Sequence, residues 1–371
     1  MSAKCLPALK PLAPEHDGLS RVKPNSHEPI AGRMEQTKAA AINWLSDRPN
    51  WRQRLRTYIV SRGVHVMCGS ADYVSADYAS DIPLLSGAAR LAWLKALGAL
   101  GVKNFITRSG LGYDFVCHTG DLANFPFYDR QAYRPELQLC LGWLQGEDSP
   151  VVYDIGANDG FVSTHLAQML AGHAPKIYAF EPTPTTFAKL VQSVERLGLS
   201  NSVYPVAAAV IDNPRPVRIS YSERNSLLAQ IHQPGLNPRG GDRIADAKGV
   251  TLDEISSLTR TFPQLLKIDA EGSEAAVFRG AQRLLSRPDR PAILFECNAA
   301  TLGQCGESVA TLTDLLGGYA LYYVNDYCGQ KIPFGDPVEN PANIDWVCNL
   351  FAVPVTDSAS RRWASVLEHR Q

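Results

Sequence analysis

The chain has 371 residues, of which 45% are hydrophobic and 20% are charged, and its formal net charge is −1 at pH 7. This composition supplies enough apolar material for a large core, and the length indicates about two domains or one large α/β domain with appendages. The nearly balanced charge argues against binding of nucleic acid or of an anionic membrane through bulk electrostatics.

The eight cysteines are scattered, with no CxxC pair and no His/Cys cluster at zinc spacing. Disulfide frameworks are typical of short secreted chains, so we expect reduced thiols here. The first residues lack the continuous apolar core of a signal peptide. The longest apolar stretch, near 88–100, is interrupted by Arg90 and Lys95 and is too short to span a bilayer. We therefore expect a cytoplasmic protein without a transmembrane segment.

The first hundred residues are predicted to differ from the rest of the chain. Residues 1–33 are rich in Pro, Lys and polar residues without periodicity, which is typical of disorder. Residues 34–103 are predicted to form a helical extension that includes an apolar helix over 86–100. The main domain is predicted over 104–355, and residues 356–371 are predicted to be a C-terminal tail with a short surface helix.

After residue 150 predicted strands and helices alternate, which indicates βαβ units and a parallel sheet. Helices are expected from 160 onward, after Pro184, over 273–285 and near 307–316. Residues 214–249 are predicted to form an antiparallel excursion with a polar loop. The predicted strands cover 151–155, 177–180, 203–211, 265–268, 292–295, 320–324 and 346–352.

The first of these strands runs directly into a glycine-bounded turn, within the segment VVYDIGANDGF. A buried strand, a tight glycine turn and a helix start are how open α/β sheets build a nucleotide-binding crevice. A dinucleotide site requires a further glycine for the pyrophosphate, and Asn158 occupies that position here. A ligand without phosphates relaxes this demand, and S-adenosylmethionine is such a ligand. A purely structural turn is the alternative.

Two acids accompany this turn. Asp154 precedes it and would face the ammonium group of the cofactor or its water shell, while Asn158 would hydrogen-bond the methionine portion. Glu181 ends the second strand, about 20 residues beyond the glycine turn, where an acid can accept both ribose hydroxyls. The alternative for Glu181 is a solvent-exposed acid at a strand end.

A further pair of acids follows the strand over 265–268. Strand alternation sends Asp269 to the carboxyl tip of this strand, above the same crevice. Glu271 comes just before Gly272 and a helix N-terminus. The two acids are predicted to orient a hydroxyl or to act as a base. Helix capping is the alternative, and it is the only role expected for Glu274.

Other polar residues allow secondary interpretations. Asp269, Glu296 and Asn298 would offer oxygen ligands from adjacent strand tips to a hard divalent cation. The favoured interpretation is that these groups accept hydrogen bonds and that no metal is bound. His118 and His165 are expected to be structural. His165 lies in the first helix beside the crevice and is a secondary candidate for a base.

These motifs, in this order, resemble the FkbM family of S-adenosylmethionine-dependent methyltransferases. The resemblance is carried by DIGANDG, by FEP at 180–182, by TLDEI at 251–255, and by LLKIDAEGSEAAVFRGAQRLL and ILFEC. It covers about residues 110–355, and Arg134 departs from it because the lead-in often has an acid there. The resemblance implies an α/β class I methyltransferase (Rossmann-like) fold, a doubly wound and mostly parallel sheet with an antiparallel last strand. It implies cofactor-binding positions at Asp154, Gly156, Asn158, Gly160 and Glu181, and a D-x-E-G motif at Asp269 and Glu271.

We therefore expect a methyltransferase that acts on a hydroxyl of a sugar, polyketide or related metabolite and uses S-adenosylmethionine. The acceptor itself and the oligomeric state are left open. Such a reaction requires alignment of oxygen, carbon and sulfur and removal of the hydroxyl proton, and Asp269 or Glu271 is predicted to be nearest the acceptor. The alternatives are a NAD-dependent oxidoreductase on the same sheet, which the missing glycines disfavour, and a non-catalytic cofactor-binding module.

Overall fold

The structure is a computed structural model that describes residues 65–66, 74–75, 87–121, 123–129, 131–232, 243–326 and 332–368. The disorder predicted for residues 1–33 lies outside the described residues, and so does most of the predicted helical extension. The polar loop predicted within 214–249 is likewise outside them over 233–242.

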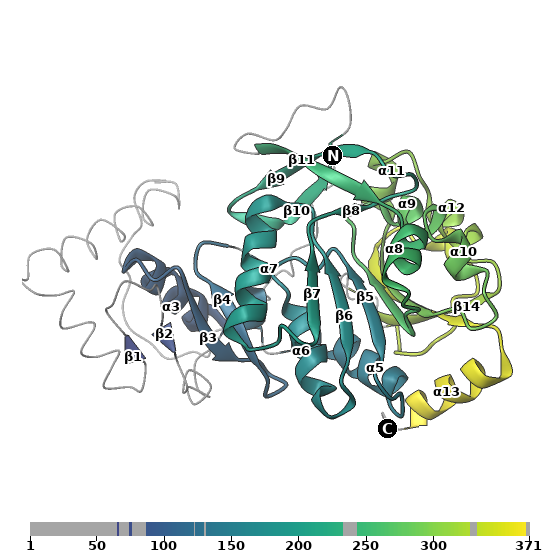
Figure 1. Ribbon diagram of the computed structural model, residues 1–371, viewed down its shortest axis with the longest axis horizontal. Helices are drawn as coiled ribbons and strands as arrows, with labels where there is room; N and C mark the ends of the chain where they lie inside the picture. Colours follow the sequence, from purple (N-terminus) through teal and green to yellow (C-terminus); the bar gives the residue numbers. More distant parts are fainter. Residues whose placement is uncertain are drawn as a thin grey trace, which may run out of the picture.

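A seven-stranded sheet forms the centre of the molecule, with the strand order β14-β15-β13-β12-β5-β6-β7 (Figure 1). Strands β7, β6, β5, β12 and β13 are parallel to one another, and β15 runs antiparallel between β13 and β14. This doubly wound, mostly parallel α/β sheet with one reversed strand confirms the predicted fold class. The strands are β5 (Val151–Ile155), β6 (Lys176–Phe180), β7 (Val203–Val206), β12 (Leu265–Ile268), β13 (Ala292–Asn298), β14 (Tyr319–Asp326) and β15 (Val347–Pro354).

Helices cover both faces of this sheet, which explains why the central strands are almost continuously apolar. One face packs against helices α5 (Arg134–Leu144), α6 (Phe161–Met169), α7 (Pro184–Arg196) and α13 (Asp357–Glu368). The other face packs against α8 (Leu252–Thr259), α9 (Glu274–Arg279), α10 (Gln282–Leu285), α11 (Ala299–Gln304) and α12 (Val309–Asp314).

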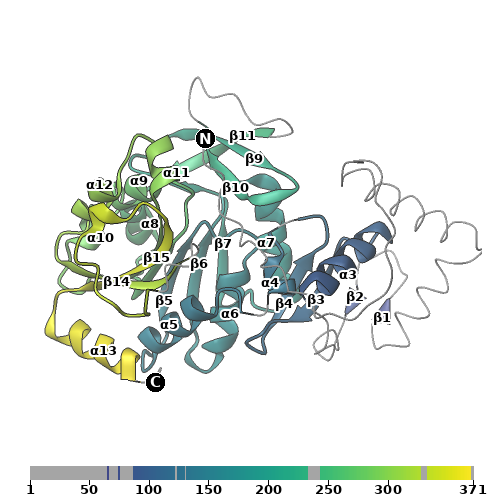
Figure 2. The same cartoon turned by 180° about the vertical axis from the view of Figure 1, so that it is seen from behind.

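Helix α13, within the predicted tail, is part of this packing. Its Trp363 ring lies 5.3 Å from the ring of Phe351 in β15 and 4.7 Å from that of Tyr322 in β14. Figure 2 shows the helix beside the edge of the sheet that carries these two strands. The tail therefore contributes a buried aromatic side chain to the core.

Two predicted elements are divided in the structure. The strand predicted over 203–211 breaks into β7 and β8 (Ala209–Val210), and β8 leaves the central sheet for a second one. The helix predicted over 273–285 breaks into α9 and α10 at Gly280. A Cβ atom at Gly280 would lie 2.1 Å from the backbone oxygen of Ile211. The backbone of Gly280 therefore packs directly against that of Ile211 at the point where the predicted helix is interrupted.

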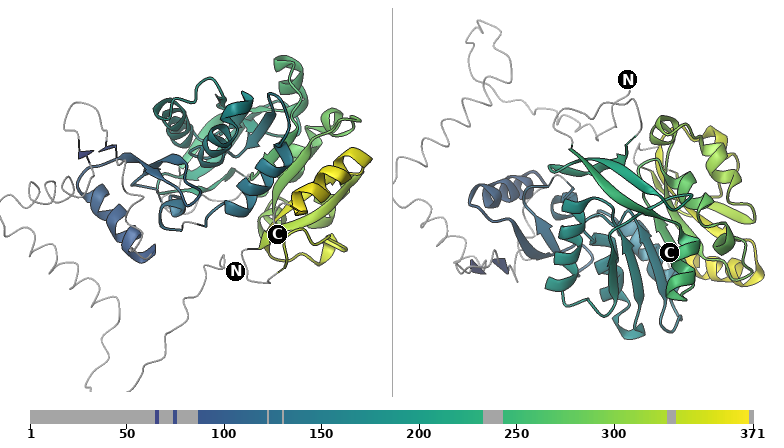
Figure 3. Two further views of the ribbon diagram at one scale, coloured as in Figure 1. Left: turned by 90° about the horizontal axis from the view of Figure 1, so that it is seen from below. Right: turned by 45° about the horizontal axis from the view of Figure 1, so that its top comes forward.

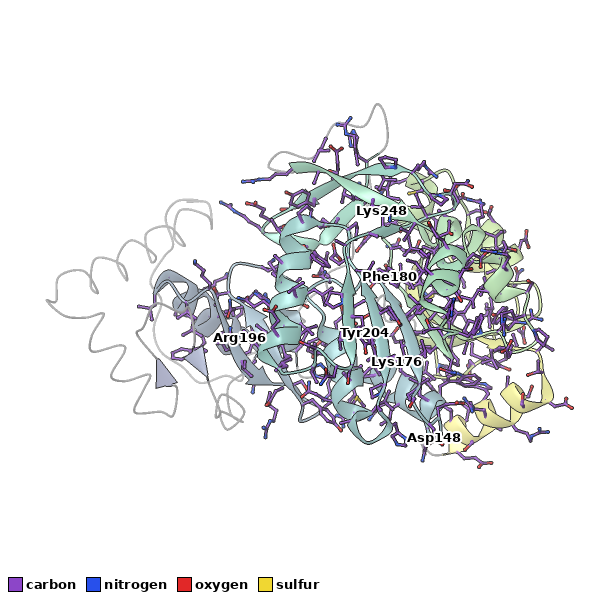
Figure 4. All side chains as sticks on the ribbon, viewed as in Figure 1. Asp148, Lys176, Phe180, Arg196, Tyr204 and Lys248 are labelled. Atoms are coloured by element: carbon purple, nitrogen blue, oxygen red, sulfur yellow. The ribbon has the colours of Figure 1, made fainter. Side chains whose placement is uncertain are left out.

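The second sheet has the order β10-β9-β11-β8 and confirms the predicted antiparallel excursion. It consists of β8, β9 (Pro216–Ser222), β10 (Asn225–Ile231) and β11 (Arg243–Val250). Figure 4 marks Lys176 and Phe180 at the two ends of β6, with Phe180 nearer to Lys248 of β11. The excursion therefore lies beyond the carboxyl edge of the central sheet.

A third sheet joins the N-terminal part to the main domain. It has the order β1-β2-β3-β4, from β1 (His65–Val66), β2 (Val74–Ser75), β3 (Asn104–Arg108) and β4 (Asp114–His118). Helices α3 (Gly87–Ala99) and α4 (Phe125–Tyr128) accompany it. The extension predicted to be helical thus also contributes strands, and the domain boundary at 103/104 stays a prediction. Figure 3 shows this sheet and α13 at opposite ends of the molecule.

The described helices are short. The longest of them, α3 and α7, have 13 residues each, and none has the length and apolar character that crossing a membrane requires.

Candidate functional site

A cavity lies at the carboxyl edge of the central sheet, and its volume is about 970 Å³ when the space at its solvent-open entrance is included. Its lining comes from the turn after β5, the ends of β6 and β12, the segment before α5, and strands β9 and β10 of the excursion. This is where open α/β sheets bind their ligands. Among the predicted site residues, those that line it are Gly156, Asn158, Glu181, Asp269 and Glu271.

The two glycines of the turn have different tasks. Gly156 has φ +75°, and a Cβ atom there would lie 1.9 Å from the backbone oxygen of Asp269. Only glycine allows the β5 turn to come this close to the tip of β12. Gly160 has φ +88° and faces Leu190 of α7, where a Cβ atom would lie 2.6 Å from Cδ1. Gly160 does not line the cavity, so its contribution is to shape the turn.

The Glu181 carboxylate is fixed to the glycine turn. Its Oε2 accepts a hydrogen bond from the backbone N–H of Asn158 at 3.1 Å, and its Oε1 accepts one from that of Thr183 at 2.8 Å. Burial raises the pKa of Glu181 to about 7. The carboxyl group therefore lies at the strand tip predicted for the ribose, and it is partly protonated at neutral pH.

Asn158 connects the turn to the excursion. Its φ is +53°, in the left-handed region that Asn tolerates better than most residues. Its Oδ1 accepts a hydrogen bond from Ser226 Oγ of β10 at 2.7 Å. The amide nitrogen of Asn158 takes no part in this bond, so it could donate a hydrogen bond to a bound methionine portion.

Asp154 does not line the cavity. Its side chain is fully buried, its Oδ2 accepts a hydrogen bond from Ser163 Oγ at 2.6 Å, and its Oδ1 lies 3.6 Å from Lys267 Nζ. Direct contact with the ammonium group of a cofactor, as the sequence suggested, is not compatible with this position. Asp154 instead acts on the cavity through Lys267.

Lys267 is a site residue that the sequence argument missed. It is 8% exposed, lines the cavity, and has its Nζ 3.5 Å from Oδ2 of Asp269. Burial alone would lower the pKa of Lys267, but the carboxylates of Asp269 and Asp154 raise it, so the ammonium form persists. A lysine inside the otherwise apolar strand LLKI, in register with Asp154, was the available signal.

Glu274 holds the turn that presents the two acids. It is buried, and its Oε1 accepts hydrogen bonds from the backbone N–H groups of Ala270 at 3.0 Å and Gly272 at 3.2 Å. Glu271, between them, has φ +49°. Burial raises the pKa of Glu274 to about 7. Its role is thus wider than the helix-end electrostatics that was predicted, because it fixes the backbone of the D-x-E-G turn.

The candidate metal ligands differ from the predicted set. Carboxylate oxygens of Asp269, Glu271 and Glu296 all lie within 4.8 Å of one another, so these three could hold a cation. Asn298 was wrongly included. It is buried, and its Oδ1 accepts hydrogen bonds from the backbone N–H groups of Ala300 and Thr301, which caps α11. The prediction that no metal is bound stays a prediction.

Tyr133 also lines the cavity and was not predicted. It precedes α5 with φ +56°, a backbone conformation that side-chain-bearing residues adopt rarely, and its ring lies 5.4 Å from that of Phe161. Burial, and then the charges of Asp269 and Glu136, raise the pKa of Tyr133 well above its usual range. Its hydroxyl therefore stays protonated. The neighbouring Arg134 does not line the cavity.

Neither histidine is placed to act as a base. His165 is fully buried, its Nδ1 lies 2.8 Å from the backbone oxygen of Phe161, and its ring centroid is 4.0 Å from the Phe161 ring. Burial lowers the pKa of His165 to about 4 and that of His118 to about 3. Neither ring lines the cavity, so both residues are structural and His165 is removed as a base candidate.

Asp121 joins three segments beside the glycine turn. It is buried, and its Oδ2 lies 2.5 Å from Lys189 Nζ of α7. Its Oδ1 accepts hydrogen bonds from the backbone N–H groups of Ala123 and of Ser226 in β10. Together with the Asn158–Ser226 bond, this ion pair attaches the β10 wall of the cavity to the turn.

The strand order, the glycine turn with an acid on the next strand tip, and the acids at the end of β12 define the class I S-adenosylmethionine-dependent methyltransferases. Residues 154–323 match the sequence family described as the methyltransferase FkbM domain. The chain therefore contains an FkbM methyltransferase domain, which confirms the resemblance seen in its motifs.

The individual proteins that resemble this chain share little of its sequence. The chain is 26% identical over 141 residues to the hexuronic acid methyltransferase AglP of Haloferax volcanii, which spans 38% of this chain and about half (54%) of AglP. A solved FkbM methyltransferase from Methylobacillus flagellatus has a TM-score of 0.38 and 16% identity, covering 63% of this chain and 53% of its own. TYW2 of M. jannaschii in complex with AdoMet has a TM-score of 0.34 and 13% identity, covering 67% and 85%.

Proposed function

We propose that this protein transfers a methyl group from S-adenosylmethionine to a hydroxyl oxygen of a sugar, polyketide or related metabolite. One observation carries the proposal. A single cavity joins the glycine turn and Glu181, which suit the cofactor, to Asp269 and Glu271, which suit a hydroxyl.

The cofactor end fits this ligand. Gly156 leaves the backbone of the turn without a side chain in the way, and Glu181 offers carboxylate oxygens to ribose hydroxyls. When bound, S-adenosylmethionine supplies an electrophilic methyl group. The protein contributes alignment, because reacting atoms held in line can gain several orders of magnitude in rate.

The acceptor end fits a hydroxyl group. The Asp269 side chain is 30% exposed, and the Lys267 ammonium group 3.5 Å away holds its carboxylate in place. A carboxylate there accepts a hydrogen bond from the acceptor hydroxyl and takes up its proton as the new bond forms. Glu271, in the same turn, is the second candidate for this role.

The comparisons support the proposal at two levels. The FkbM match speaks for methyl transfer and against the oxidoreductase alternative. AglP, by its name, methylates a hexuronic acid, which supports a sugar-like acceptor for a related domain. Only a measurement of turnover distinguishes the methyltransferase from the alternative, a non-catalytic cofactor-binding module.

The test uses the full chain with methyl-labelled S-adenosylmethionine and a cell extract, and mass spectrometry identifies labelled products. Asp269→Asn is expected to lower turnover by about 100-fold or more, as loss of a general base does, and to leave S-adenosylhomocysteine affinity within a few-fold. Asp314→Asn, an exposed residue of α12, is the matched control and keeps wild-type turnover.

Two results would contradict parts of the proposal. If Asp269→Asn stays within a few-fold of wild type, the base is another group. If S-adenosylhomocysteine binds but no extract yields a labelled product, the domain is a non-catalytic cofactor-binding module.

A further inference from the structure

The methionine portion of S-adenosylmethionine brings an ammonium group into the cavity, and Asp154 cannot contact it. Asp154 is fully buried and does not line the cavity. The described residues that do line it include four acids, which are Asp159, Glu181, Asp269 and Glu271. Glu181 is placed for the ribose, and the last two lie at the acceptor end. Asp159 is the acid to which the proposed function gives no task.

Asp159 belongs to the glycine turn and lies at the start of α6. Its Oδ1 accepts a hydrogen bond from the backbone N–H of Phe161 at 3.3 Å. Its Oδ2 has no hydrogen-bond or ion-pair partner among the described residues, and the side chain is half-buried in the wall of the cavity. The first oxygen therefore fixes the side chain, while the second is available to a ligand.

The charges around Asp159 favour a cationic ligand. Burial, and next the charge of Asp121, raise the pKa of Asp159 to about 7, whereas the charge of Lys189 lowers it. Lys189 does not neutralise Asp159, because its Nζ lies 2.5 Å from Oδ2 of Asp121. The protein alone therefore stabilises the ionised form of Asp159 poorly, and a cation on a bound ligand would stabilise it.

The neighbouring Asn158 offers the complementary group. Its amide nitrogen takes no part in the bond with Ser226 and can donate a hydrogen bond into the cavity. A donor and an anionic acceptor on adjacent residues match the carboxylate and the ammonium group of an amino acid. The backbone N–H of Asn158 is bonded to Glu181, so both residues lie next to the position proposed for the ribose. The covalent order of the cofactor requires this proximity, because its sulfur joins the ribose to the methionine portion.

We propose that Oδ2 of Asp159 binds the ammonium group of the methionine portion, and that the amide nitrogen of Asn158 donates to the carboxylate of the same portion. This inference rests on the proposed function, and it assigns to Asp159 the task that the sequence argument gave to Asp154. The competing interpretation is that Asp159 only caps α6 through Phe161. Capping alone predicts that ligand affinity does not depend on an ammonium group near Asp159.

The test compares three ligands by calorimetry on the full chain at pH 7.5, where most of Asp159 is ionised. S-adenosylhomocysteine carries both charged groups, its deaminated analogue keeps only the carboxylate, and 5′-methylthioadenosine has neither. Asp159→Asn keeps an oxygen for the N–H of Phe161 but removes the negative charge. We expect it to weaken S-adenosylhomocysteine binding about 10–100-fold, as loss of a charge-assisted hydrogen bond does. It should bind the other two ligands at least as tightly as wild type does.

Two further variants complete the comparison. Asp159→Ser can accept the bond from Phe161 through its hydroxyl oxygen, and it should show the same selective loss. Glu195→Gln, on the exposed face of α7, is the control and should bind all three ligands as wild type does. Binding of 5′-methylthioadenosine shows that each variant is folded.

The outcomes separate the inference from the function beneath it. If both Asp159 variants bind S-adenosylhomocysteine within a few-fold of wild type, the ammonium group lies elsewhere and the inference is wrong. Equal weakening of S-adenosylhomocysteine and its deaminated analogue also overturns the inference, while cofactor binding stands. If the wild-type protein binds neither S-adenosylhomocysteine nor 5′-methylthioadenosine, the proposed function fails and the inference fails with it.

Discussion

Because the carboxyl group of Glu181 is buried, we expect the effect of Glu181→Gln on protein stability to change sign with pH. Burial raises its pKa from 4.5 to about 7. A raised folded-state pKa means that the stability contributed by the protonated group is complete below about pH 4.5 and is lost as the pH rises through 7. With 1.36 kcal/mol per pKa unit, ionisation in the absence of ligand costs about 3 kcal/mol at pH 8.

Glu181→Gln removes this cost, because an amide does not ionise. It also replaces one carboxylate oxygen by an NH₂ group, which cannot accept the hydrogen bond from Asn158, at a cost of about 1 kcal/mol. The variant without ligand should therefore be about 2 kcal/mol more stable than wild type at pH 8, or about 4–8 °C higher in Tm. Near pH 4 it should be about 1 kcal/mol less stable.

Thermal unfolding of both proteins without cofactor, measured at several pH values, checks this expectation. Glu195→Gln, on the exposed face of α7, is the control and should follow wild type at every pH. If Glu181→Gln is destabilised equally at pH 4 and pH 8, the carboxyl group is not held at a raised pKa and the reasoning is wrong.

Three further predictions follow from the site. Gly156→Ala should destabilise the protein by roughly 2–5 kcal/mol and abolish S-adenosylhomocysteine binding in calorimetry, whereas Gly303→Ala, in open space on α11, should be neutral or stabilising by up to about 1 kcal/mol. Lys267→Met leaves Asp154 buried without its partner and should cost about 3–5 kcal/mol in urea unfolding, and adding Asp154→Asn should recover part of that loss. If ribose hydroxyls bind ionised Glu181, S-adenosylhomocysteine binding should release about half a proton from this group at pH 7, seen as a buffer-dependent part of the binding enthalpy that Glu181→Gln lacks.

Local pattern predicted the elements that build the cofactor end. The apolar run of β5, the glycines that follow it, and an acid after the next strand place Gly156 and Glu181 correctly, because the consecutive parallel strands β5 and β6 are neighbours in the sheet. Strand limits were less accurate. The predicted strand over 292–295 runs on to Asn298, which becomes a helix cap, and this removes it from the acid group.

Contacts between distant segments were outside the reach of the sequence. Asp121 meets Ser226 across more than a hundred residues, and Tyr133 reaches the cavity from the segment before α5. Asp154 shows a related difficulty. Its place on β5 is plain from the sequence, but its partners Ser163 and Lys267 belong to other elements, and they determine that it points into the protein.

The D-x-E-G turn is placed by residues other than the two acids that are predicted to face the acceptor. Lys267 and the buried Asp154 hold the carboxylate of Asp269 from behind, and Glu274 fixes the turn through the N–H groups of Ala270 and Gly272. Methyl transfer tolerates little misplacement of its reacting atoms, so such supporting groups are needed as much as the acids that face the acceptor. In this motif, therefore, an acid that lies off the cavity can still control the position of the one that lines it.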